Sequence, residues 1–534
     1  MSLIGSSQAT VRGAELAIRE QLRCCFPRRD INRVSFVDST PLWRNSRLRL
    51  NRFTLKAIQI EPLRSDSLSS HAPSSSSKSQ NGVRLFVGLP LDAVSDCNTV
   101  NHTRAITAGL KALKLLGVEG VELPIWWGVV EKEAMGKYEW SGYLSLAEMV
   151  QKAGLKLHVS LCFHADQQHK LSLPLWVSRI GESEPDIFFK DRSGLHCKDC
   201  LSFAVDNLPV LDGKTPIEVY QDFCESFKSS FSRFMGSTIT GITMGLGPNG
   251  ELRYPSHHKA AKGSNGVGEF QCYDRNMLKI LKQHAEATGN PLWGTGGPHD
   301  APSYNELPNS NNFFNDNGGS WESTYGDFFL SWYSNQLLFH GDRLLSLASA
   351  AFGNSNVAIY AKLPLVHSWY KTRAHPSELT AGFYSTALKD GYEPISKMFA
   401  RNSCKMILPG MDLLDEHQPQ QSLSSPESLL AKIRMACRKF GVEISGQNSL
   451  ISRAPYHFKQ IRKSIAGENM VDLFTYQRMG AEFFSPEHFP PFTEFVRNLN
   501  QVEMHTDDLP EEEEHAGESL SRTSSGSSVE MQAV

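Results

Sequence analysis

Eight short runs of apolar and β-branched residues recur between residues 83 and 480, and this spacing constrains the fold of the 534-residue chain more than any other feature. Runs of this length and composition, bounded by turn residues, are typical of buried strands. The runs occupy residues 84–89, 120–125, 155–161, 239–244, 357–362, 405–408, 442–445 and 471–476.

Helical periodicity fills the gaps between these runs. Apolar residues recur every three or four positions over 103–116, and four phenylalanines share one helical face over 220–234. Strands that alternate with helices pair in parallel through right-handed crossovers. Eight such units predict an α/β fold of the (β/α)8 TIM-barrel type, with long loops on its carboxyl-terminal face. A doubly wound open sheet is the second choice, because no Gly-x-Gly-x-x-Gly follows the first run.

The two ends of the chain differ in composition from this central region. Residues 1–80 hold eleven Arg and two Lys against six acids, a balance of +7 in a chain whose net charge is −3. Arg-rich, Ser-rich and acid-poor segments are typical of organelle transit peptides, although an ordinary disordered tail has a similar composition. We therefore expect a plastid transit peptide and disordered segment in 1–80, a barrel in 81–504, and a flexible acidic, Ser-rich tail in 505–534. The expected location is the chloroplast stroma.

The composition also argues against several classes of partner and cofactor. A net charge of −3 gives no support to a nucleic-acid partner, and no run of 18 apolar residues predicts a membrane span. Cys197 and Cys200 form a Cys-x-x-Cys, but neither a thioredoxin-like context nor a second pair of zinc ligands accompanies it. We expect a structural or incidental role for this pair, with redox sensing as the alternative. No metal or other cofactor is expected.

The loops after the strand ends build the active face of a TIM barrel. Five tryptophans occur in these loops, and aromatic planes stack on sugar rings, although each indole taken alone is explained at least as well by core packing. They are Trp126, Trp127, Trp176, Trp321 and Trp369. The polar side chains expected at this face are His164, Glu251, Lys362, His367, Gln447, Asn448 and Arg478.

Several uninterrupted motifs between residues 83 and 500 resemble the plant β-amylases, glycoside hydrolase family fourteen. They lie at 126–128, 245–256, 268–274, 332–334 and 378–384, and the second reads Gly-Leu-Gly-Pro-Asn-Gly-Glu-Leu-Arg-Tyr-Pro-Ser. The resemblance implies a barrel enzyme that releases β-maltose from starch with inversion, with Glu251 as the general acid. It also implies that His164, Lys362, His367, Asn448 and Arg478 bind sugar or support the acid.

The chain departs from the family at the position of the general base. An inverting hydrolase needs a second carboxylate that activates water. The family motif Gly-Glu-Asn-Ala-Leu is here Gly-Gln-Asn-Ser-Leu at 446–450, so an amide, Gln447, stands at the base position. Acids that might replace the base are Asp166, Asp412 and Glu443, but none lies where the family places it, and Glu443 is about 13 Å away along its strand.

Three further departures affect binding of the substrate. A family Asp before the tryptophan pair is here Pro124, and a family Thr that contacts substrate is here Pro409. The segment 164–170 matches the family's mobile lid but lacks its glycines and is shorter. Such lids exclude water and complete the site.

These departures predict a catalytically inactive β-amylase-like protein, similar to the inactive plastid members of the family. We expect a regulatory or scaffolding role in starch degradation, with an active starch-degrading enzyme such as an amylase as a partner. Two alternatives remain open: a weak exo-acting α-1,4-glucan maltohydrolase, and a non-catalytic sensor that binds maltose or glucan.

Overall fold

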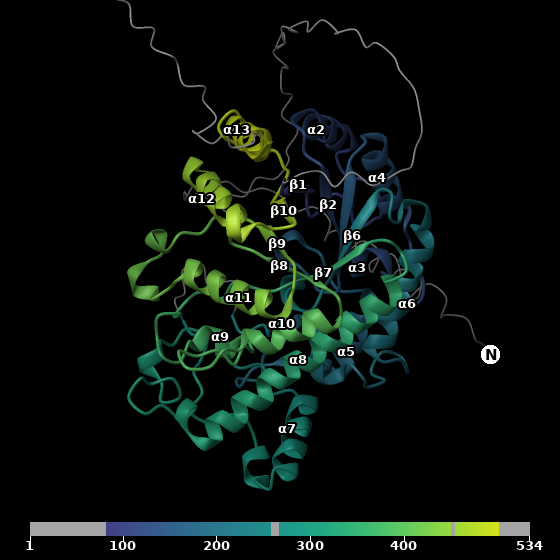
Figure 1. The fold of residues 1–534 in the computed structure, drawn as a ribbon. Coiled ribbons are helices and arrows are strands. Elements are labelled where there is room, and N and C mark those ends of the chain that lie inside the picture. Colours follow the sequence, from purple (N-terminus) through teal and green to yellow (C-terminus); the bar gives the residue numbers. More distant parts are fainter. Residues whose placement is uncertain (1–81, 258–265, 450–453, 501–534) are drawn as a thin grey trace, which may run out of the picture. The chain divides into compact units, whose positions relative to one another are not determined.

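The computed structural model describes residues 82–257, 266–449 and 454–500. Within these residues, eight parallel strands close into a barrel in the order β1-β10-β9-β8-β7-β6-β3-β2, with helices around them (Figure 1). The strands are β1 (Arg84–Gly88), β2 (Gly120–Trp126), β3 (Lys156–Cys162), β6 (Ile239–Met244), β7 (Ala358–Lys362), β8 (Lys405–Leu408), β9 (Ile444–Gln447) and β10 (Leu473–Tyr476). The predicted (β/α)8 barrel is confirmed, and each predicted run supplies one strand. The expected transit peptide in 1–80 and the acidic tail in 505–534 lie outside the described residues.

The helices follow the strands in the expected alternation. They are α2 (Thr103–Leu116), α3 (Trp127–Val130), α4 (Ser141–Lys152), α5 (Leu175–Ser183), α6 (Pro216–Ser230), α7 (Arg275–Ala287), α8 (Thr324–Phe352), α9 (Pro376–Thr380), α10 (Tyr392–Arg401), α11 (Pro426–Phe440), α12 (Pro455–Ile465) and α13 (Phe489–Asn500). The helix predicted at 103–116 is confirmed in full. The helix predicted at 220–234 instead begins at Pro216, because Thr215 and Glu218 form a capping box there, and it ends at Ser230. A 3-10 turn, Ser232–Phe234, follows it, so the last two of the four phenylalanines lie beyond the helix.

The alternation of side chains along β2 places three residues on one face of the strand. β2 pairs with β3 in register from Gly120–Lys156 to Trp126–Cys162. Because successive side chains point to opposite faces, Glu122, Pro124 and Trp126 point the same way, and all three line one cavity inside the barrel mouth. The strand therefore presents a carboxylate, a proline ring and an indole to the same cavity.

The opposite end of the barrel is held by charged side chains. Asp472 accepts hydrogen bonds from Arg84 at 3.0 Å, from Lys405 at 2.8 Å and from Tyr360 at 3.2 Å. Lys405 also forms a 2.5 Å ion pair with Glu443. This network joins the first and last strands of the barrel and occupies Glu443, one of the acids considered as a replacement base.

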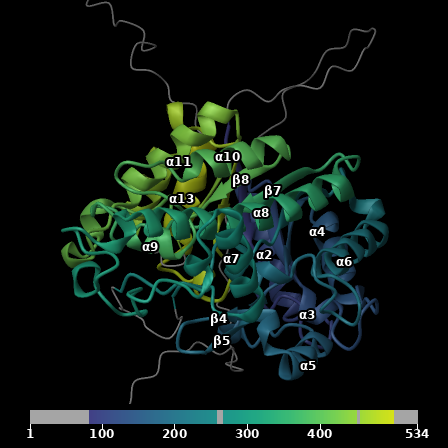
Figure 2. The ribbon, with the colours of Figure 1, turned by 90° about the horizontal axis from the view of Figure 1, so that it is seen from below.

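A small hairpin outside the barrel was not predicted. It consists of β4 (Phe188–Lys190) and β5 (His196–Leu201), which pair antiparallel (Figure 2). The hairpin is short, and its second strand contains Lys and Asp, which have low strand propensity. The strand β5 carries both members of the Cys-x-x-Cys motif.

Candidate functional site

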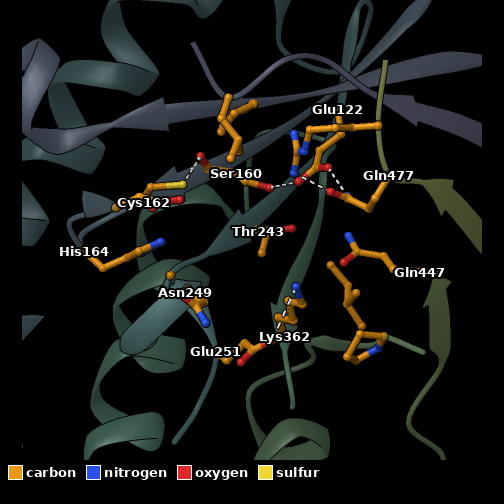
Figure 3. Close-up of a pocket in the computed structure, with 18 of the residues that line it drawn as sticks. Glu122, Ser160, Cys162, His164, Thr243, Asn249, Glu251, Lys362, Gln447 and Gln477 are labelled. Atoms are coloured by element: carbon orange, nitrogen blue, oxygen red, sulfur yellow. Dashed lines mark hydrogen bonds and ion pairs between the residues drawn. The ribbon is translucent and has the colours of Figure 1, made fainter. Parts of the chain in front are cut away.

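A cavity of about 490 Å³ lies at the carboxyl ends of the barrel strands (Figure 3). Six of the seven predicted site residues line it: His164, Glu251, Lys362, Gln447, Asn448 and Arg478. The seventh, His367, lines a neighbouring cavity of about 390 Å³. The two cavities share Glu251, Pro409 and Ser449, so the predicted residues are divided between adjoining spaces.

Glu251 is held in place by the strand next to its own. A short 3-10 turn at Pro248–Gly250 follows β6, and Leu252 then donates a 3.0 Å backbone hydrogen bond to Lys362 at the end of β7. The Oε2 atom of Glu251 accepts a 2.9 Å hydrogen bond from Arg253 Nε, and Oε1 lies 3.5 Å from Lys362 Nζ. The carboxylate is therefore held between two cations in the cavity wall.

Gln447 is the last residue of β9 and is buried in the cavity wall. Its backbone carbonyl accepts a 3.0 Å hydrogen bond from Met411. The side-chain amide can donate and accept hydrogen bonds, but it does not take up a proton near neutral pH. The cavity that contains Glu251 thus holds, at position 447, a group that cannot activate water as a base.

Asn448 and Arg478 are occupied by contacts within the wall of the cavity. Asn448 Oδ1 accepts a 2.6 Å hydrogen bond from the Gln477 backbone amide, and Asn448 Nδ2 donates to the Gln477 carbonyl at 3.1 Å. Arg478 donates to the Leu89 carbonyl at 2.6 Å and to the Gln477 side chain. Both predicted sugar-binding residues therefore also serve to join the ends of β1, β9 and β10.

Glu122 is a second carboxylate in the cavity, and the sequence reasoning missed it. Its Oε1 accepts a 2.7 Å hydrogen bond from Ser160, and its Oε2 accepts one of 2.6 Å from Gln477 Nε2. Burial raises the pKa of Glu122, but Arg478 and these hydrogen bonds outweigh that effect, so the pKa is lowered overall. A carboxylate with a lowered pKa is a poor proton acceptor, and Glu122 does not replace the missing base. The feature of the sequence that could have indicated Glu122 is the presence of an acidic residue inside an otherwise apolar run.

The other candidate acids are also engaged. Asp412 is fully buried and accepts hydrogen bonds from Ser449 N at 2.5 Å and Ser449 Oγ at 2.6 Å. Asp166 accepts a 3.1 Å hydrogen bond from a backbone amide and lies 3.0 Å from His169 Nδ1, in the loop after β3. Neither acid replaces the carboxylate that is expected at position 447, where this chain has an amide.

The two predicted histidines have different surroundings. His164 packs edge-to-face against Trp126, with ring centroids 5.2 Å apart. His367 Nδ1 lies 2.6 Å from Ser424 Oγ, and burial lowers the pKa of His367 to about 4. His367 is therefore neutral at pH 7 and adds no positive charge to its cavity.

Of the five tryptophans expected in loops, Trp126 ends β2 and Trp127 and Trp176 lie in α3 and α5. Only one of the five lines the main cavity. Trp126 does so, with its Nε1 donating a 2.9 Å hydrogen bond to the Leu91 carbonyl. Trp127, Trp176, Trp321 and Trp369 are buried, as core packing predicts. The expected aromatic lining is thus reduced to a single indole.

The segment that matches the family's lid forms a hydrogen-bonded turn. Asp166 and Leu171 exchange backbone hydrogen bonds of 2.7 and 2.9 Å, which closes a loop around the 3-10 turn Gln167–His169. Asp199 of β5 forms two hydrogen bonds with this loop. Its carbonyl accepts from Ala165 N at 2.7 Å and its carboxylate accepts from Gln167 Nε2 at 2.7 Å. We call residues 165–171 the pinned loop.

The cavity wall carries three carboxylates, Glu122, Asp166 and Glu251, and two permanent cations, Lys362 and Arg478. Arg478 interacts electrostatically with Glu122, and Lys362 pairs with Glu251. Over residues 82–257, 266–449 and 454–500, no group of three or more His, Cys, Asp or Glu side chains is arranged to hold a metal ion, and no helix is long and apolar enough to cross a membrane. The space suits a neutral polar ligand better than an ionic one.

The chain resembles proteins of known family over most of its length. The family model described as Glycosyl hydrolase family 14 matches residues 86–504. The chain is 60% identical over 528 residues to Inactive beta-amylase 9 of Arabidopsis thaliana, covering 98% of this chain and 97% of that protein. It is 41% identical to Beta-amylase 1, chloroplastic, of the same plant, over 79% of this chain and 76% of that one. The catalytic domain of beta-amylase from Paenibacillus polymyxa shares the fold, with a TM-score of 0.65 and 24% identity over 78% of this chain and 99% of that domain.

Proposed function

We propose that this chain, which belongs to glycosyl hydrolase family 14, is a catalytically inactive β-amylase-like protein. The observation that carries the proposal is the presence of Gln447, an amide, in the same cavity as Glu251, where an inverting hydrolase needs a base. Loss of a general base lowers the rate by about 10²–10⁴-fold. The names of two relatives, Inactive beta-amylase 9 and the 37% identical Inactive beta-amylase 4, chloroplastic, support the same reading.

The remaining features of the cavity lead to the same conclusion. Pro124 and Pro409 line the space without offering a side-chain hydrogen bond. The pinned loop is tied to Asp199 and carries none of the glycines that a moving lid uses as hinges. Three separate parts of the catalytic apparatus would need to change before the chain could hydrolyse glucan.

The proposed setting is the plastid, and the proposed role is regulatory or scaffolding in starch degradation. The names of related proteins include the word chloroplastic, and residues 1–80 have the composition of a transit peptide. A family barrel without the family's chemistry can still present its outer surface to another protein. The proposed partner is an active starch-degrading enzyme such as an amylase.

The test of inactivity is maltose release from soluble starch by the full-length protein. We expect no release above the buffer control, and Glu251→Gln should be indistinguishable from the unchanged chain. Turnover by the unchanged chain that Glu251→Gln abolishes would instead establish the weak maltohydrolase.

A non-catalytic sensor of maltose or glucan is the second candidate. The observation that favours it is the open cavity of about 490 Å³, whose lining combines polar side chains with the indole of Trp126. Titration calorimetry with maltose and maltotetraose tests it, with Lys362→Met as the control that alters the wall of the cavity. Saturable heat in the unchanged chain that Lys362→Met weakens supports a sensor, whereas no heat at millimolar sugar favours the scaffolding role.

A further inference from the structure

The Cys-x-x-Cys motif lies at a break in the pairing of the β4–β5 hairpin. Phe189 stands opposite Cys197, but the next residue along β4, Phe188, stands opposite Leu201. Residues 198–200 therefore form a bulge that the partner strand does not match. In a regular strand, two side chains three residues apart would be separated by roughly 10 Å. The bulge departs from that regular geometry, and Cys197 is a side-chain hydrogen-bond partner of the Cys200 thiol.

The two thiols differ in accessibility in the way that a dithiol pair requires. Cys197 is half-buried, whereas Cys200 is 4% exposed. Hydrogen bonding to Cys197, together with burial, raises the pKa of the Cys200 thiol. An accessible thiol that exchanges with an outside disulfide, backed by a buried thiol in contact with it, can close an internal disulfide.

The bulge is also the part of the hairpin that holds the pinned loop. Asp199 lies between the two cysteines, and it accepts hydrogen bonds from Ala165 N and Gln167 Nε2, each 2.7 Å long. Asp166 and His169 of that loop line the main cavity. Cys200 also lies within electrostatic reach of Arg253, the residue that pairs with Glu251. The bulge is therefore hydrogen-bonded to a loop that forms one wall of the cavity.

We propose that Cys197 and Cys200 form a reversible disulfide, and that its formation loosens the pinned loop at the mouth of the cavity. The Cys197 thiolate attacks one sulfur of an oxidised disulfide, such as glutathione disulfide or an oxidised protein dithiol, and releases one thiolate. Cys200 then loses its proton to solvent and attacks Cys197 Sγ, which releases the second thiolate. Two electrons and two protons leave the pair, and the oxidant becomes two thiols. The proposal does not depend on whether the cavity binds glucan.

Closing the disulfide should loosen the pinned loop. The sulfur–sulfur separation falls from hydrogen-bond contact to about 2.05 Å, which shifts residues 198–199. The hydrogen bond from Ala165 N to Asp199 then weakens. Loss of one such bond, about 1 kcal/mol, corresponds to an increase of about fivefold in amide exchange at Ala165.

The experiment uses the full-length protein equilibrated in glutathione buffers of defined redox ratio, alkylated and mapped by mass spectrometry. We expect a link between Cys197 and Cys200 that dithiothreitol reverses, and faster hydrogen exchange in a peptide covering 164–171. Cys200→Ser should abolish both effects. Cys197→Ser provides the same test at a more exposed position should Cys200→Ser fail to fold. Cys97→Ser, at an exposed cysteine elsewhere, should leave both effects unchanged.

Two results would overturn the proposal. One is that both thiols remain open to alkylation in the oxidising buffers. The other is that the link forms while exchange over 164–171 stays the same. Neither cysteine lines the main cavity, and neither readout involves starch. A failure here is therefore distinct from a failure of the proposed inactivity.

Discussion

The side-chain amide of Gln477 donates a 2.6 Å hydrogen bond to Glu122, and this contact joins β2 to the residue that follows β10. The same carboxylate interacts electrostatically with the half-buried Arg478. Glu122 is itself buried, and both residues line the cavity. Each charge stabilises the other, because removing one leaves its partner without a counter-charge in a poorly solvated site.

Replacing Glu122 alone should therefore destabilise the protein strongly. We expect Glu122→Met to lower the free energy of unfolding by about 3–5 kcal/mol, because it leaves Arg478 without a counter-charge. The double variant Glu122→Met with Arg478→Met should lose less than the sum of the two single losses. Urea denaturation of all four proteins measures this coupling. Losses that simply add would show that the two charges do not interact.

His158 should make the protein sensitive to mild acid. It lies in the barrel interior, 2.6 Å from Thr243 Oγ1, and burial lowers its pKa from 6.5 to about 4. The unfolded chain takes up this proton as the pH falls below 6.5, and the folded chain does so only near 4. The contribution to stability is therefore fully present above pH 6.5 and is lost as the pH falls from 6.5 towards 4.

The matched variant is His158→Gln, which keeps a polar group beside Thr243 and removes the titration. Between pH 7.5 and pH 5, its unfolding free energy should fall by about 2 kcal/mol less than that of the unchanged chain. Urea denaturation at the two pH values gives the comparison. Equal falls in the two proteins would mean that His158 is not the group that titrates.

Restoring the missing base alone should not restore catalysis. We expect Gln447→Glu to release no maltose from soluble starch, because Pro124, Pro409 and the pinned loop remain unchanged. The double variant Gln447→Glu with Glu251→Gln is the control for contaminating activity. A gain of about 10²-fold or more in Gln447→Glu that the control lacks would show that the base was the only missing part.

Glu251 should behave as a structural residue. Removing a working catalytic carboxylate often stabilises an enzyme, since active sites trade stability for activity. Here Arg253 and Lys362 both depend on Glu251, so Glu251→Gln should lower the unfolding free energy by about 1–3 kcal/mol. Thermal or urea denaturation checks the sign. A more stable variant would mean that the acid is still held in a strained, catalytic arrangement.

The strands were predictable from the sequence because a parallel barrel buries both faces of each strand. The run predicted at 442–445 became a strand at 444–447, because the Val442 amide closes the end of α11 by donating to the Cys437 carbonyl at 2.9 Å. The β4–β5 hairpin escaped prediction because it is short and its second strand is partly polar. The register in which β4 pairs with β5 cannot be read from the sequence and is seen only in the folded structure.

The part of the site that consists of single residues at the ends of strands was predictable from the sequence. Glu251 and Gln447 were expected at the mouth of the barrel because one follows a strand and the other ends one, and both line the main cavity. Their roles as acid and base position come from the resemblance to the family. The Glu122 network was not predictable in the same way, because its partners lie 38 and 355 residues away in the chain. The location of His367 was also not predictable, because the loop that carries it places it in the neighbouring cavity.

Closure of the barrel by pairing of β1 with β10 has a consequence for synthesis of the chain. Arg84 and Asp472, which form an ion pair at this seam, are 388 residues apart. At about 5–20 residues per second, a ribosome needs roughly 20–80 s to produce that stretch. Throughout this interval one edge of β1 has no strand to pair with, and an open edge invites pairing with other chains. The pairing that closes the barrel therefore becomes available only when nearly the whole of the described chain has been synthesised.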